Sequence, residues 1–226
     1  WYVMPVQSFD HIQFVGGMHN RSLVKTRARY RGIMEDIYST YTTAATGTAF
    51  PFTDVAESRW SYPYIKELYD AGVVNGTSAT TFSPAANVTR AQFVTMLAGL
   101  AGADVSNCPA TPFRDVPEGA WYAPYVNWAL ANGIVSGTSA ATFSPDASIT
   151  RQDMAVMLYS YTQRFQVYLQ QQPVTPFTDA DSIAAYAQVA VQTLQRAGVI
   201  SGMPDGSFQP YGTATREQAC TMLCML

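Results

Sequence analysis

The chain has 226 residues, of which 48% are hydrophobic, so it is long and apolar enough to form a packed core. Charged residues make up only 13% and the formal net charge is -3, which argues against broad electrostatic capture of nucleic acid. No stretch approaches the roughly 18 apolar residues needed to span a membrane. Cys108, Cys220 and Cys224 match no metal-binding spacing, and the sequence indicates no cofactor.

Residues 1–49 have no counterpart later in the chain. Aromatic and aliphatic residues mix over residues 1–15 in a way that suits one or two strands, and residues 29–41 suit a short helix. Residues 42–48 are typical of a linker. We expect an N-terminal extension of α+β character, either the tail of an upstream domain or a segment packed on the rest. Because the sequence opens at Trp1 without a secretory signal, we expect a fragment or a processed product.

From residue 50 onward the sequence repeats itself three times, and this internal period predicts a repeat architecture. Each repeat opens on the pattern Phe-x-Asp, and the repeats are spaced by 61 and 64 residues. One helix pair of this size is too small to bury both of its apolar faces, so the three repeats should share one core. The expected repeats cover residues 50–103, 111–170 and 175–226.

Within each repeat the sequence predicts a helix, a short extended loop and a second helix. A glycine suited to a left-handed backbone ends the first helix, at Gly72, Gly133 and Gly198. A threonine can cap the second helix, and the residue three positions later can reach back to complete a capping box. These pairs are Thr89 with Gln92, Thr150 with Asp153, and Thr215 with Gln218.

An arginine follows the capping threonine in every repeat: Arg90, Arg151 and Arg216. A cation in the first turn faces the positive end of the helix dipole, which costs roughly 0.3 to 1 kcal/mol when exposed. Three such residues require a negative partner, either a carboxylate of the fold or an acidic ligand. An aspartate precedes each arginine by 36 or 37 residues, so a structural ion pair inside each repeat is one alternative. We favour ligand contact for the arginines.

The ordered triplication of Phe-x-Asp-(Val/Ala), Gly-x-x-x-Gly and Thr-Arg-x-(Gln/Asp) resembles the S-layer homology domain family over residues 50–226. The resemblance implies a mainly α fold, in which three helix-loop-helix repeats form a pseudo-threefold spindle around a central helical bundle. It implies non-covalent anchoring of a secreted bacterial surface protein to secondary cell wall polysaccharide, a glycan attached to peptidoglycan that often carries an anionic pyruvate-ketal sugar. No catalysis, metal or cofactor is implied for these residues.

By the same resemblance, the ligand lies in grooves between repeats and is gripped by the arginine, the Asp and Trp near the start of a repeat, and the central Gly turn. A guanidinium can bind a ketal carboxylate bidentately while helix N-terminal N–H groups point the same way. Trp60 and Trp121 would either cover a sugar ring or belong to the core. The implied site residues are Arg90, Arg151, Arg216, Asp54, Asp115, Asp179, Trp60, Trp121, Tyr186, Gly76, Thr77, Gly137 and Thr138.

The sequence departs from the family pattern in two ways. The glutamate of the family's Thr-Arg-Ala-Glu motif is replaced by Gln92, Asp153 and Gln218. The third repeat carries Tyr186 in place of the tryptophan, and residues 202–204 read Gly-Met-Pro instead of Gly-Thr-Ser.

Two other functions remain open from the sequence. The first is a structural module that self-associates in a surface layer. Alternatively, the chain is the C-terminal anchor of an extracellular hydrolase or adhesin whose main domain lies upstream. Residues 1–49 contain no set of nucleophile, base and orienting group, so we expect no enzyme activity from this chain itself.

Overall fold

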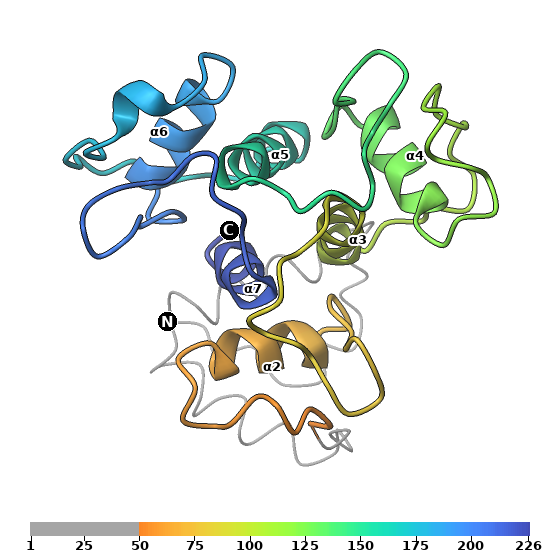
Figure 1. Ribbon diagram of the computed structural model, residues 1–226, viewed down its shortest axis with the longest axis horizontal. Coiled ribbons are helices and arrows are strands. Elements are labelled where there is room, and N and C mark those ends of the chain that lie inside the picture. Colours follow the sequence, from red (N-terminus) through yellow and green to blue (C-terminus); the bar gives the residue numbers. More distant parts are fainter. Residues whose placement is uncertain (1–49) are drawn as a thin grey trace, which may run out of the picture.

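The computed structural model describes residues 50–226, and the expected N-terminal extension lies outside this range. Within it, the regular structure consists of α-helices and one short 3-10 turn, with isolated β-bridges in place of strands (Figure 1). The expectation of a mainly α fold is confirmed. The helices are α2 (Tyr62–Asp70), α3 (Arg90–Ala101), α4 (Ala123–Ala131), α5 (Arg151–Arg164), α6 (Gln188–Arg196) and α7 (Arg216–Cys224), with the 3-10 turn η2 (Ala180–Ser182) before α6.

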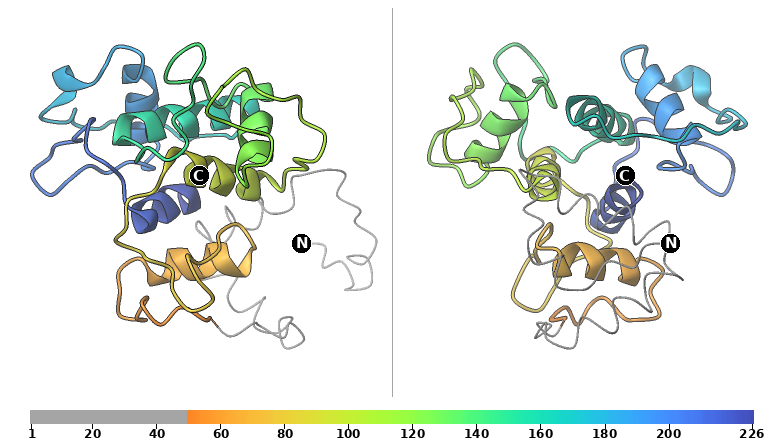
Figure 2. Two further views of the ribbon diagram at one scale, coloured as in Figure 1. Left: turned by 45° about the vertical axis from the view of Figure 1, so that its right-hand side comes forward. Right: turned by 180° about the vertical axis from the view of Figure 1, so that it is seen from behind.

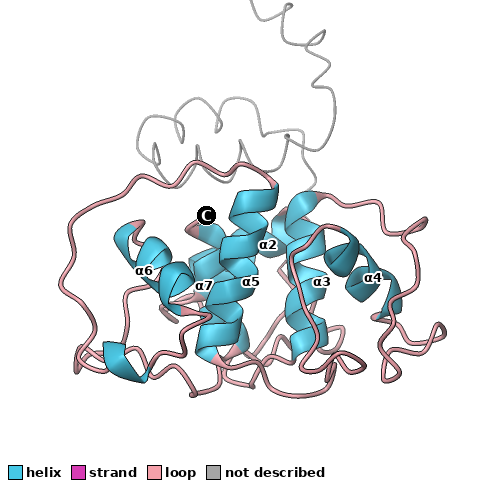
Figure 3. Cartoon of the chain, turned by 90° about the horizontal axis from the view of Figure 1, so that it is seen from above, coloured by secondary structure: helices cyan, strands magenta, loops and turns pink. Residues whose placement is uncertain are grey.

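The six helices form an inner and an outer set. Helices α3, α5 and α7 gather at the centre, while α2, α4 and α6 each belong to one of three outer lobes (Figure 1). The view from behind shows the same three-lobed arrangement (Figure 2), and the view from above shows long loops joining the helices (Figure 3). This is the pseudo-threefold spindle with a central bundle that the resemblance implied.

The helices of each repeat pack on those of the next repeat. Helix α3 packs on α4, α5 packs on α6, and α7 returns to pack on α2. Each central helix therefore pairs with the outer helix of the following repeat, and the last repeat closes the ring on the first. The sequence predicted a shared core, but it did not predict this exchange of partners.

Three backbone hydrogen bonds close the ring near its axis. The N–H of Val88 donates to the carbonyl oxygen of Ala214 at 3.0 Å, that of Ala214 to Ile149 at 3.3 Å, and that of Ile149 to Val88 at 3.0 Å. All three side chains are fully buried. Each repeat thus contributes one donor and one acceptor to a cyclic contact, which satisfies buried backbone groups without a sheet.

The first backbone N–H groups of each central helix also find partners in the next repeat. The N–H of Arg90 donates to Ala147 O at 2.9 Å and that of Ala91 to Pro145 O at 3.0 Å. The same contacts recur at the start of α5 and α7. These donors have no partner inside a helix, and here the neighbouring turn supplies one. The prediction that they point at a ligand is therefore wrong.

The threonine caps are confirmed, with one exception in the capping boxes. Thr89 with Gln92, and Thr215 with Gln218, form both bonds of the box. Thr150 accepts from the backbone N–H of Asp153, but the Asp153 side chain does not return to the cap. The prediction of a box at α5 is wrong because this carboxylate has other partners, described below.

Other local predictions hold. Gly72, Gly133 and Gly198 have φ values of 69°, 67° and 74°, as a left-handed helix end requires. Cys220 and Cys224 are buried in the core. The six phenylalanines that recur in the repeats are also buried: Phe52, Phe82, Phe113, Phe143, Phe177 and Phe208.

Candidate ligand-binding grooves

Each of the three arginines reaches from its helix to a phenylalanine of the next repeat. The Nε–H of Arg90 donates to the carbonyl oxygen of Phe143 at 2.8 Å, and the guanidinium carbon lies 4.8 Å from the centre of the phenyl ring. Arg151 makes the same two contacts with Phe208 at 2.6 and 5.1 Å. Arg216 makes them with Phe82 at 2.8 and 4.5 Å. Backbone carbonyl and ring face together stabilise the cation.

The arginines are almost fully enclosed. Exposed fractions are 6% for Arg90, 3% for Arg151 and 5% for Arg216. Burial lowers the pKa of all three guanidinium groups, and nearby acidic groups act in the opposite direction. Arginine nevertheless stays protonated in proteins, so three positive charges are held at the interfaces between repeats.

The aspartates near the start of each repeat hold the turn that presents this phenylalanine. Asp115 accepts hydrogen bonds from the backbone N–H of Phe143 at 2.8 Å and of Ser144 at 2.7 Å, where Ser144 has a φ of 57°. Asp54 and Asp179 bind the equivalent turns in the same way. The alternative of an Asp–Arg ion pair inside each repeat is wrong, because each carboxylate accepts hydrogen bonds from backbone N–H groups instead.

Aspartate and arginine nevertheless act on the same residue from two different repeats. Asp115 holds the N–H of Phe143, and Arg90 of the preceding repeat holds its carbonyl oxygen. Burial lowers the pKa of Arg90, and the charge of Asp115 opposes that shift together with Asp153 and Tyr186. The sequence spacing of 36 residues therefore pointed to the right residue types but to the wrong repeat.

The aromatic residues near the start of each repeat are exposed. Trp60 is 56% exposed, Trp121 is 59% exposed and Tyr186 is 61% exposed. The alternative that Trp60 and Trp121 belong to the core is therefore wrong. The ring of Tyr186 is open to solvent, while its hydroxyl donates to Asp153 Oδ1 at 2.7 Å and accepts from Gln152 Nε2 at 3.0 Å. Desolvation of this hydroxyl, together with Asp153, raises the pKa of Tyr186 to about 12.

Glycine is required in the central turn of each repeat by close packing. A Cβ atom on Gly137 would lie 2.2 Å from the oxygen of Ser139 and 2.6 Å from Cε1 of Phe113. Gly76 is enclosed in the same way by Ser78 and Phe52. The adjacent Thr138 hydroxyl lies 2.8 Å from Ser144 Oγ, so the turn is tied to the strained residue that Asp115 holds.

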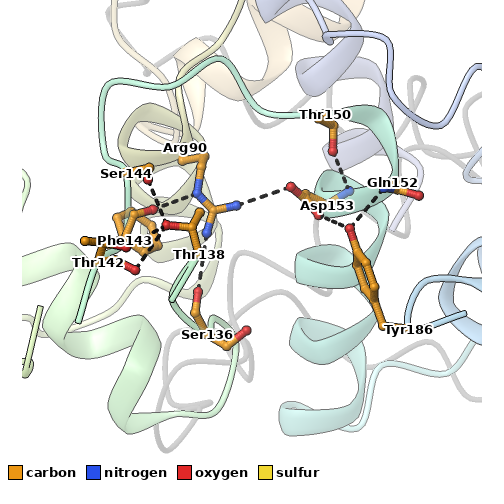
Figure 4. A network of polar contacts seen from close by, with 10 residues as sticks. All are labelled: Arg90, Ser136, Thr138, Thr142, Phe143, Ser144, Thr150, Gln152, Asp153 and Tyr186. Atoms are coloured by element: carbon orange, nitrogen blue, oxygen red, sulfur yellow. Dashed lines mark hydrogen bonds and ion pairs between the residues drawn. The ribbon is translucent and has the colours of Figure 1, made fainter. Parts of the chain in front are cut away.

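A pocket of about 490 Å³ lies where the three repeats meet at Arg90. It is lined by Arg90 from α3, by residues 133–138 of the second repeat, by one face of α5, and by Tyr186 of the third repeat. Figure 4 shows Asp153 between Arg90 and Tyr186. Four predicted site residues are thereby brought together: Arg90, Gly137, Thr138 and Tyr186.

Asp153 is the pocket residue that the sequence analysis missed as a site residue. Its Oδ2 lies 3.5 Å from Nη1 of Arg90, in an ion pair, while its Oδ1 accepts from Tyr186. Sequence reasoning assigned Asp153 a capping role only. The available signal was its acidic charge at a position where the other two repeats carry glutamine.

The remaining predicted site residues do not line this pocket. Trp60 and Trp121 occupy the place in their repeats that Tyr186 occupies in the third, and Arg151 and Arg216 correspond to Arg90. No group of three His, Cys, Asp or Glu side chains suited to a metal ion occurs in residues 50–226. Within that same range, every helix is too short or too polar to cross a membrane.

The fold is a closed ring of three helical repeats, with a pocket at one repeat interface that contains the Arg90–Asp153 ion pair and is flanked by Tyr186. The model of the S-layer homology domain matches residues 51–94, 112–155 and 176–220. The chain belongs to the S-layer homology domain family. As a member of that family it is a cell-wall-anchoring module of a surface protein.

Similar proteins carry such modules in long chains. An endoglucanase of Bacillus sp. (strain KSM-635) is 39% identical over 193 residues, which is 83% of this chain and 20% of that protein. The S-layer protein sap of Bacillus anthracis is 27% identical over 180 residues, 80% of this chain and 21% of that one. A cellulosome-anchoring protein of Acetivibrio thermocellus is 28% identical over 157 residues, 68% of this chain and 35% of that one. The present chain thus spans between a fifth and about a third of these relatives.

Proposed function

We propose that residues 50–226 anchor a surface protein by binding an anionic, pyruvylated secondary cell wall polysaccharide in the grooves between repeats. The observation that carries the proposal concerns Arg151 and Arg216. Both guanidinium groups are almost fully enclosed, and no carboxylate within residues 50–226 lies within 4 Å of either. A buried cation whose partners are carbonyl oxygens and a phenyl ring is incompletely neutralised, and a ligand carboxylate would complete its coordination.

Low exposure is compatible with ligand contact. Arg90 is as enclosed as the other two arginines, yet it lines a pocket of about 490 Å³. A small exposed area at the end of a guanidinium group is sufficient, because bidentate recognition of a carboxylate uses only two N–H donors. The fixed position of each arginine also limits the entropy lost on binding.

The exposed aromatic rings support a carbohydrate ligand. Trp60 and Trp121 expose more than half of their surface, and a large apolar ring face in such a position can cover the C–H face of a sugar. We assign a positioning role to Asp54, Asp115 and Asp179, because their carboxylates hold the turn against which each arginine is fixed. No catalytic step is assigned to this module.

The proposal is tested by changing the polysaccharide instead of the protein, since the arginines also support the fold. The full chain is sedimented with purified cell walls whose polysaccharide retains its pyruvate ketals, and with walls from which mild acid has removed them. We expect binding to the first that weakens as salt is added, and much weaker binding to the second. Equal binding to both would exclude an anionic ligand. Light scattering without polysaccharide measures self-association, the competing structural function.

A further inference from the structure

The groove at Arg90 differs from the other two interfaces in its charge. Asp153 places a carboxylate 3.5 Å from the guanidinium of Arg90, so this cation already has an anionic partner in addition to the carbonyl oxygens of Phe143 and Ser136. Within residues 50–226, Arg151 and Arg216 have no such partner. One groove is therefore neutralised by the protein itself.

Two sequence differences combine to build this neutral groove. The residues equivalent to Asp153 are Gln92 and Gln218, whose side chains accept from the backbone N–H of the capping threonines. The residues equivalent to Tyr186 are Trp60 and Trp121, which lack its hydroxyl. Since the hydroxyl of Tyr186 donates to Asp153 at 2.7 Å, the aspartate and the tyrosine form one interaction that neither of the other repeats can make.

The orientation of Asp153 is fixed on both sides. Its Oδ2 faces Arg90, its Oδ1 receives the hydroxyl of Tyr186, and Gln152 donates to the same hydroxyl. A ligand carboxylate that approached Arg90 would have to lie close to this fixed negative charge, and like charges a few ångströms apart repel strongly in a partly desolvated groove. Asp153 therefore opposes an anionic sugar in this groove.

The same groove offers contacts suited to a neutral sugar. The hydroxyls of Thr138 and Ser160 and the carboxylate of Asp153 line it as hydrogen-bonding groups, and the exposed ring of Tyr186 flanks it. A carboxylate accepts hydrogen bonds from sugar hydroxyls without requiring a charge on the ligand. We propose that the groove at Arg90 selects an uncharged sugar unit of the wall polysaccharide, whereas the interfaces at Arg151 and Arg216 take the anionic unit. This inference rests on the proposed function.

The experiment follows two matched probes by NMR on the 15N-labelled full chain. One probe is a methyl hexoside carrying a 4,6-pyruvate ketal, and the other is the same hexoside without the ketal. In the unmodified protein we expect the neutral hexoside to shift the amide signals of Gly137 and Thr138, with the ketal binding there about 10-fold more weakly or worse. Asp153→Asn keeps the size of the side chain, and we expect it to bring the ketal to within about threefold of the neutral hexoside.

A reciprocal variant provides the control. Gln92 occupies in α3 the position that Asp153 occupies in α5, and by the cyclic order of the repeats it faces the interface of Arg216. Gln92→Asp should weaken binding of the ketal hexoside at the amides of Gly76 and Thr77 and leave the neutral hexoside unchanged. The dispersion of the amide spectrum verifies that both variants are folded.

The outcomes separate this inference from the proposed function. If the ketal hexoside binds at Gly137 and Thr138 of the unmodified protein as tightly as the neutral one, or if Asp153→Asn changes nothing, the inference is overturned. If the protein sediments with pyruvylated walls but neither probe shifts these two amides, the inference is overturned while the proposed function stands. If no wall polysaccharide binds at all, both are overturned.

Discussion

Arg90 and Phe143, 53 residues apart, form one interlocked contact: the guanidinium donates to the carbonyl oxygen of Phe143 at 2.8 Å and lies 4.8 Å from the centre of its ring. The contact recurs twice around the ring and joins every repeat to the next. Each arginine is thus a structural link as well as the candidate ligand group, so a loss of binding in an arginine variant has to be separated from a loss of stability.

The first prediction concerns that structural role. Arg216→Ala removes the donors to Phe82 O at 2.8 Å and to Asn75 O at 2.9 Å, and it leaves the buried carbonyl group of Phe82 without its arginine partner. We expect the free energy of unfolding to fall by about 2 to 4 kcal/mol. Urea denaturation followed by circular dichroism measures it. The exposed Arg196 serves as the control, because Arg196→Ala should change stability by less than about 0.5 kcal/mol. Equal effects would contradict the structural role.

The second prediction concerns closure between the first and third repeats. Glu217, buried at the start of α7, accepts from Arg59 at 2.7 and 2.8 Å and from Ser61 at 2.6 Å. Glu217→Ala should lower the free energy of unfolding by about 2 kcal/mol, because it leaves Arg59 and Ser61 without their acceptor. Arg59 is partly exposed, which keeps the loss below that of a fully buried pair. An unchanged denaturation midpoint would contradict this role.

The same carboxylate gives the third prediction, a dependence of stability on pH. Desolvation alone would raise the pKa of Glu217, but the hydrogen bonds from Arg59 and Ser61 lower it overall from the ordinary value of 4.5. The stabilisation is therefore complete above pH 4.5 and is lost as the pH falls through the lower pKa of the folded state. Glu217→Gln should reduce the change in unfolding free energy over this range. Parallel pH series of the two proteins, each by urea denaturation, measure the difference, and identical slopes would refute it.

The fourth prediction concerns the central turn. A Cβ atom on Gly137 would lie within 2.6 Å of Ser139 O, Thr142 O and Phe113 Cε1, two of which belong to the backbone. Gly137→Ala should therefore shift the backbone and cost about 1 to 3 kcal/mol of stability. At Gly119 nothing lies within 4 Å of the same atom, so Gly119→Ala is the matched control and should be nearly neutral. Thermal unfolding of both variants measures the difference, and equal midpoints would contradict the close packing around Gly137.

The fifth prediction concerns the thiols. Burial raises the pKa of Cys220 to about 12, and Cys224 is also buried, whereas Cys108 is only partly covered. Because the thiolate is the reactive form, a thiol reagent at neutral pH should modify Cys108 in the folded chain and all three cysteines only after unfolding. Counting modified thiols by mass spectrometry, with and without denaturant, tests this. Rapid modification of Cys220 in the folded protein would contradict its placement.

Several features of this protein were determined by short stretches of sequence. All of the threonine caps, the left-handed glycines and the buried phenylalanines were predicted. They depend on residues a few positions away in the chain or on the regular spacing of apolar residues. The three copies also identified the family, because order and spacing are properties of the chain itself. The exposure of Trp60 and Trp121 to solvent was not predictable from the sequence, since their helical spacing suits a core residue equally well.

The partners of charged groups were decided only by the tertiary structure. The sequence does not indicate that α3 packs on the outer helix of the next repeat. The hydrogen bond from Arg90 to the carbonyl oxygen of Phe143, and the backbone donors to Asp115, were therefore not predictable. The sequence indicated a capping role for Asp153 because a local hydrogen bond was available. Its carboxylate instead contacts Arg90 and Tyr186, which are 63 and 33 residues away in sequence. A capping bond depends on local backbone geometry, whereas an ion pair across repeats depends on how the ring closes.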